Sequence, residues 1–84
     1  ELELRYGFDF ELNNLPSSIK KITFVKYSKY NKELNCLPSG LSILKLPAGY
    51  NQKIHLIPSG LSKLICSAGY EFIKDFADVQ VETY

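Results

Sequence analysis

The sequence is poor in the features that indicate a membrane anchor, a disulfide scaffold or a partner of strong charge. No apolar run approaches the ~18 residues that span a bilayer. Two cysteines are too few for the dense disulfide frameworks of small secreted domains. Ten Lys and Arg against nine Asp and Glu leave a net charge of +1, too small for a field that attracts nucleic acid or acidic membranes. We therefore expect a soluble, cytoplasmic protein without membrane or nucleic-acid partners.

Groups that carry chemistry are also scarce. His55 is the only histidine, and the sequence offers it neither a positioned nucleophile nor further metal ligands. The glycines form no phosphate-binding fingerprint. Asp75, Asp78 and Glu82 match neither a helix-borne acid and base pair nor a calcium loop. The expectation is a protein without enzymatic activity, cofactor, metal site or small-molecule substrate.

What the sequence does contain is a repeat with a period of about 20 residues. Residues 37–42 (LPSGLS) recur as residues 57–62 (IPSGLS) and, more weakly, as residues 15–20 (LPSSIK). The first residues of these copies are 22 positions apart (15 to 37) and 20 positions apart (37 to 57). The extra two residues fall within the loop at residues 25–29.

An alternating apolar triplet starts seven positions after each copy begins (15 to 22, 37 to 44, 57 to 64), and residues 2–4 form an earlier copy. Such triplets predict short strands with one buried face. Each repeat is too small to bury its apolar residues alone, so the copies should stack in parallel. Three ladders are expected inside the stack: Leu2, Ile22, Leu44 and Leu64; then Leu4, Phe24, Leu46 and Cys66; and the aromatic residues Phe8, Tyr30, Tyr50 and Tyr70 on the return side.

The predicted fold is a leucine-rich-repeat-like solenoid of about four short parallel strands, with extended or irregular return segments and little helix. Residues 1–74 would hold the copies, the first of them incomplete, and residues 75–84 a C-terminal cap or tail. The tail's apolar residues should cover the last repeat, because open solenoid ends need caps, and residues 79–82 suit one more strand. Cys36 and Cys66 both fit apolar core positions, and we expect no disulfide between them.

The pattern Leu-Pro-Ser-x-Leu-x-x-Leu-x-Leu, followed by an aromatic-Asn pair, resembles the FNIP repeat of the leucine-rich repeat class. The likeness covers nearly all of residues 1–74. The pair reads Tyr-Asn at residues 30–31 and 50–51, but Phe-Asp at 8–9 and Tyr-Glu at 70–71, so an Asn ladder through every copy is not expected. The resemblance implies a curved stack that binds proteins, often beside an F-box or another domain.

Residues that flank the inward ones should face outward and line up across copies on an open strand face. The expected rows are Glu1, Lys21, Ile43 and Lys63; then Glu3, Thr23, Lys45 and Ile65; then Arg5, Val25, Pro47 and Ser67. Exposed β-branched residues beside lysines suit a protein contact with an apolar centre and a charged rim. They are also simply good strand formers. The predicted partner-binding residues are Lys21, Thr23, Val25, Ile43, Lys45, Lys63 and Ile65.

Two functions from different classes follow. In the leading hypothesis the segment binds a protein partner through its open strand face, as the recognition part of a larger protein, which the resemblance suggests to be ubiquitin-ligase-like. In the alternative it stacks end to end in a coat or filament, because uncovered strand edges invite pairing. A cluster of Lys20, Lys21, Lys26, Lys29 and Lys32 with Tyr27 and Tyr30 has the composition of a nucleic-acid site. Nearby Glu33 and the small net charge argue against that use.

Overall fold

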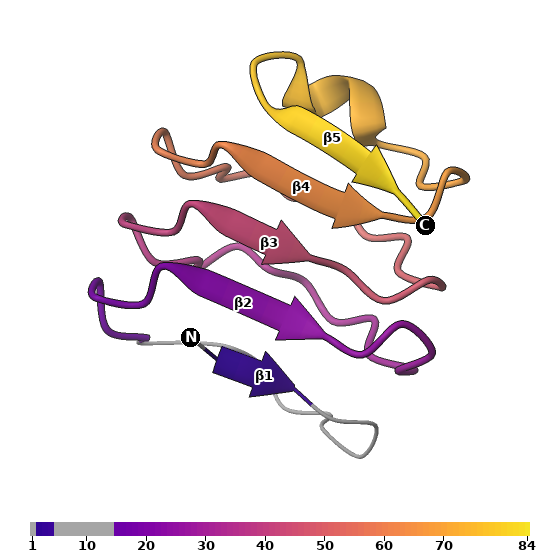
Figure 1. The fold of residues 1–84 in the computed structure, drawn as a ribbon, viewed down its shortest axis with the longest axis horizontal. Helices are drawn as coiled ribbons and strands as arrows, with labels where there is room; N and C mark the ends of the chain where they lie inside the picture. Colours follow the sequence, from indigo (N-terminus) through magenta and orange to yellow (C-terminus); the bar gives the residue numbers. More distant parts are fainter. Residues whose placement is uncertain (1, 5–14) are drawn as a thin grey trace.

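The computed structural model describes residues 2–4 and 15–84 of the chain (Figure 1). One five-stranded parallel sheet has the strand order β1-β2-β3-β4-β5. The strands are β1 (Leu2–Leu4), β2 (Lys21–Phe24), β3 (Ile43–Lys45), β4 (Lys63–Cys66) and β5 (Gln80–Thr83). Figure 1 shows them stacked in order, with return segments behind the sheet and the 3-10 helix η1 (Ile73–Phe76) at the β5 end. The chain is a parallel β-solenoid, as predicted.

The strand register confirms the first predicted interior ladder. Ile22 pairs with Leu44, and Leu44 pairs with Leu64 on the next strand. All three side chains are fully buried, and the residues immediately before them on each strand are only partly buried. Burial of such a side chain stabilises the fold by roughly 1.5–3 kcal/mol. The ladder therefore contributes directly to the cohesion between copies.

The described side chains of the second ladder and of the aromatic ladder are also buried, and the two ladders meet inside the solenoid. Phe24, Leu46 and Cys66 are almost completely buried behind β2, β3 and β4. The ring of Tyr30 stacks on that of Phe24 with the ring centroids 4.7 Å apart. The core thus runs from the sheet to the return segments. Phe8, expected in the aromatic ladder, lies outside the described residues.

The Pro-Ser motif forms the same turn before β2, β3 and β4. In each copy the backbone N–H three residues after the proline donates to the proline carbonyl; these bonds are Ile19 to Pro16 (3.2 Å), Leu41 to Pro38 (3.1 Å) and Leu61 to Pro58 (3.1 Å). The proline is thus the first residue of each turn and supplies the acceptor of its hydrogen bond. Successive turns are then joined through serine, since the Ser62 hydroxyl donates to the Ser42 carbonyl at 3.0 Å and the Ser42 hydroxyl to the Lys20 carbonyl at 3.1 Å.

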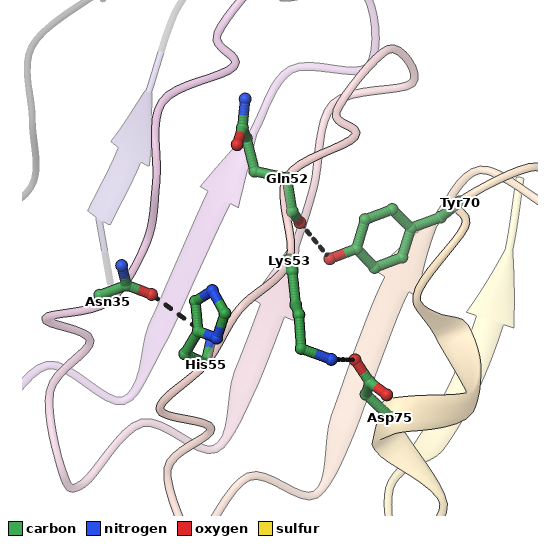
Figure 2. Close-up of polar contacts among 6 residues, drawn as sticks. All are labelled: Asn35, Gln52, Lys53, His55, Tyr70 and Asp75. Atoms are coloured by element: carbon green, nitrogen blue, oxygen red, sulfur yellow. Dashed lines mark hydrogen bonds and ion pairs between the residues drawn. The ribbon is translucent and has the colours of Figure 1, made fainter.

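Tyrosine hydroxyls connect the return segments of neighbouring copies. The Tyr50 hydroxyl donates to the Lys32 carbonyl at 2.8 Å, and the Tyr70 hydroxyl donates to the Gln52 carbonyl at 2.7 Å (Figure 2). Both rings are buried, and this burial is the main cause that raises the pKa of each phenol above its ordinary value. Each tyrosine therefore fills the core with its ring and satisfies a backbone carbonyl with its hydroxyl.

Asparagine side chains make a second set of links on the return side. The Asn31 side-chain carbonyl accepts the Asn51 backbone N–H at 3.0 Å. The Asn35 side-chain carbonyl likewise accepts the His55 N–H at 3.3 Å (Figure 2). Each bond joins residues one repeat apart. Irregular return segments thus obtain hydrogen bonds that a helix or sheet would otherwise supply.

The C-terminal residues cap the last repeat, as the apolar pattern of the tail predicted. Phe76 of η1 is buried, with its ring centroid 6.5 Å from that of Tyr70. Phe72, Ile73, Val79 and Val81 pack partly buried against the core. Lys53 of the preceding copy forms an ion pair with Asp75 at 2.8 Å (Figure 2). The tail also adds β5 beside β4, one residue later than residues 79–82.

Candidate binding surface

Two of the predicted outward rows lie side by side on the sheet. Strand pairing aligns Lys21 with Ile43 and Ile43 with Lys63, and it aligns Thr23 with Lys45 and Lys45 with Ile65. Together with Val25, just after β2, these are the seven residues predicted to bind a partner, and all of them are partly exposed. We call this surface the open strand face. The cap extends its rows with Gln80 and Glu82 of β5.

The third predicted row is wrong at one position. Pro47 was expected on the open strand face, but it is fully buried. The side chain of Tyr84, the residue after β5, reaches back across β4 and donates its hydroxyl to the Leu46 carbonyl. This end of the face is therefore occupied by a residue of the cap. Partial burial, with a smaller effect of nearby Cys66, raises the pKa of Tyr84 to about 12. Arg5 lies outside the described residues.

Two lysines and two tyrosines gather where β2 and β3 end. The Lys26 ammonium lies 5.3 Å from the ring centroid of Tyr27 and 5.1 Å from that of Tyr84. The Lys45 ammonium lies 5.8 Å from the centroid of the same Tyr84 ring. These distances are within the range of cation–π attraction. We call Lys26, Tyr27, Lys45 and Tyr84 the lysine–tyrosine cluster.

Sequence reasoning identified only part of this cluster as a binding site. Lys45 was predicted on the face, whereas Lys26 and Tyr27 appeared only among basic and aromatic residues weighed for nucleic acid. That larger group does not share one surface, because Tyr30 is buried in the core while Tyr27 is 65% exposed. The repeat pattern did not indicate Tyr84 as part of a site, because its position depends on the pairing of β5 with β4.

Lys63, the lysine of the open strand face nearest the cap, already has an acidic neighbour. The Lys63 ammonium lies 3.1 Å from a carboxylate oxygen of Glu82, with 33% and 47% of the two side chains exposed. At this exposure the pair contributes little stability, roughly 0–1 kcal/mol. Its consequence is a local balance of charge at the β4–β5 edge.

The two cysteines have different environments, and neither forms a disulfide. Cys66 is buried as predicted, and burial raises the pKa of its thiol. The prediction for Cys36 was wrong, because this residue is exposed. Leu56, at the same repeat position, is 67% exposed as well. The return segment bends at both places and turns these side chains outward, while the nearby Leu34 and Ile54 fill the core.

Titratable groups elsewhere show no assembled site. His55 is exposed, as are Asp75 and Asp78. Within residues 2–4 and 15–84, no three His, Cys, Asp or Glu side chains are grouped to hold a metal ion. The same part of the chain contains no helix long and apolar enough to cross a membrane.

Comparison with known proteins adds no relative: no family model matches the sequence, and neither a curated protein nor a solved structure is significantly similar to the chain. The class that the structure defines is the parallel β-solenoid with short repeats. The resemblance to the FNIP repeat remains a prediction from the residues that carry it.

Proposed function

We propose that this segment binds another protein through its open strand face, as the recognition part of a larger cytoplasmic protein. The observation that carries the proposal is the aligned pair of outward rows, in which partly exposed Ile43 lies between Lys21 and Lys63 and partly exposed Ile65 lies beside Lys45. Apolar side chains surrounded by charged ones are the usual composition of a protein contact. The proposal includes no enzymatic activity, cofactor or small-molecule substrate.

The rigidity of the strands supports this use. Ile43 and Lys45 flank Leu44, which is fully buried, and β3 pairs with a strand on each side. Side chains on such a framework lose less conformational entropy on binding than side chains on a mobile loop. Such a preformed surface therefore suits recognition of a partner.

The structure of the cap supports recognition over end-to-end stacking. Glu82 on β5 continues the row that contains Glu3 of β1. A second copy stacked in register after β5 would place its Glu3 beside this Glu82, and like charges on adjacent strands repel. Thr83 also puts a polar, exposed residue where the preceding copies bury Phe24, Leu46 and Cys66. We expect a monomer, measured as molar mass by light scattering over a wide concentration range.

A selection of displayed peptides tests the binding face directly. Peptides enriched on the wild-type protein are measured against Ile43→Asp and Ile65→Asp, and Leu56→Asp serves as the matched control on the return side, where the side chain is 67% exposed. We expect face variants that keep their melting temperature to bind at least about tenfold more weakly, which is about 1.4 kcal/mol. Peptides that bind the face variants as well as the wild type would refute the proposal.

A further inference from the structure

Building on the proposed function, we propose that the lysine–tyrosine cluster is the part of the open strand face that receives a carboxylate side chain from an acidic segment of the partner. The cluster lies at the C-terminal ends of β2 and β3, and its member Lys45, the last residue of β3, is aligned with Ile65. An acidic residue of the partner would therefore contact it while neighbouring apolar residues contact the isoleucines.

The cluster carries uncompensated positive charge. Lys26 and Lys45 approach the same Tyr84 ring, at 5.1 Å and 5.8 Å from its centroid. Neither lysine forms an ion pair with another described residue, whereas Lys53 is paired with Asp75 and Lys63 with Glu82. Two ammonium groups held beside one ring repel each other. A carboxylate between them replaces this repulsion with two attractions.

The tyrosines position the lysines without occupying the hydrogen-bond donors of the ammonium groups. Attraction to a ring face restricts where an ammonium group lies, and the group still has N–H donors to offer. Tyr84 is itself held, because its hydroxyl donates to the Leu46 carbonyl. The lysine side chains thus lose less freedom when a carboxylate binds than unrestrained surface lysines would.

The arrangement of the aromatic rings favours an acidic protein segment over nucleic acid. Nonspecific binding of single strands combines phosphate contacts with bases stacked on free aromatic rings. Here the Tyr84 ring already has lysine ammonium groups beside it, and Tyr30 is buried. Within the lysine–tyrosine cluster only Tyr27 offers an exposed ring, which suits the apolar stem of one side chain better than a run of bases.

The probe is a fluorescent hexaglutamate peptide, titrated at low ionic strength and followed by anisotropy. The test variant is Lys26→Gln with Lys45→Gln. The control is Lys20→Gln with Lys74→Gln, which removes the same charge at two exposed positions away from the cluster. We expect the test variant to bind at least about tenfold more weakly than wild type, because charge-assisted hydrogen bonds are lost. The control should change affinity less than about twofold.

Other outcomes would overturn the inference. These are equal weakening in the test and control variants, equal affinity for a hexaglutamine peptide, or tighter binding of a single-stranded RNA hexanucleotide that depends on the two lysines. The selected peptides separate this failure from failure of the proposed function. If the selected peptides still require Ile43 and Ile65, but the affinity for hexaglutamate does not depend on Lys26 and Lys45, only the carboxylate subsite is wrong. If they bind without the isoleucines, the binding face itself is wrong.

Discussion

Gly40 and Gly60 occupy the same position in two nearly identical copies, yet the structure predicts opposite effects for the same substitution. A Cβ atom added at Gly40 would lie 2.6 Å from the Ser17 carbonyl oxygen and 2.9 Å from the Lys20 ammonium. A Cβ atom added at Gly60 would have no neighbour within 4 Å. The difference arises because the added Cβ atom at Gly40 would point at the preceding copy, whereas the added Cβ atom at Gly60 would point into open space.

The magnitude follows from two terms. Replacing glycine by alanine restricts the unfolded chain and stabilises a protein by about 0.4–1 kcal/mol where the backbone is compatible. At Gly40 a backbone atom must also move, and overpacking of this kind costs about 1–3 kcal/mol. The first term is common to both sites. Gly60→Ala should therefore be neutral to stabilising, and Gly40→Ala should be less stable than Gly60→Ala by about 1–3 kcal/mol.

Urea unfolding of the two variants and the wild type, followed by circular dichroism, measures this difference. The slope of the unfolding free energy against urea should be the same in all three proteins, because neither change alters the surface exposed on unfolding. Equal midpoints for Gly40→Ala and Gly60→Ala would show that the turns before β3 and β4 do not differ in their packing, and would refute the reasoning.

Three further predictions concern the core. Leu44→Ala should lower the free energy of unfolding by about 2–5 kcal/mol, because Leu44 is fully buried between Ile22 and Leu64; an unchanged melting temperature would contradict the register. Folding raises the pKa of Tyr50 and Tyr70 above about 10, the value for an unfolded chain. The stability they provide is therefore complete below about pH 10 and falls as pH rises further. Unfolding curves measured from about one pH unit below pH 10 to about one unit above it should show this fall in stability. The fall should be smaller in the double variant Tyr50→Phe with Tyr70→Phe. An identical fall in that variant would contradict the assignment of the effect to these two tyrosines. A thiol reagent should modify Cys36 in the folded protein and Cys66 only after unfolding, as measured by mass spectrometry, since Cys36 is exposed and Cys66 is buried; rapid modification of both would show that the second ladder is open.

The sequence by itself determined the stack. Apolar triplets that alternate with polar residues and recur about every 20 residues leave each copy with one apolar face, which is buried only by stacking on its neighbours. That requirement specified the strands, their parallel order and the pairing of Ile22 with Leu44 and Leu64. It also indicated a capping tail, because Phe76 and the apolar residues around it follow the last repeat of the given sequence and can cover its apolar end.

Only the tertiary structure decided which residues at equivalent repeat positions differ in burial and contacts. Cys36 and Leu56 turn outward because the return segment bends there, and Pro47 is buried at the end of the face that Tyr84 crosses. Lys26 joins Lys45 at one ring only because β5 brings Tyr84 beside β4. A repeat pattern describes what the copies share. Contacts between a copy and its particular neighbours, including the cap, depend on where side chains meet in space, which the period does not encode.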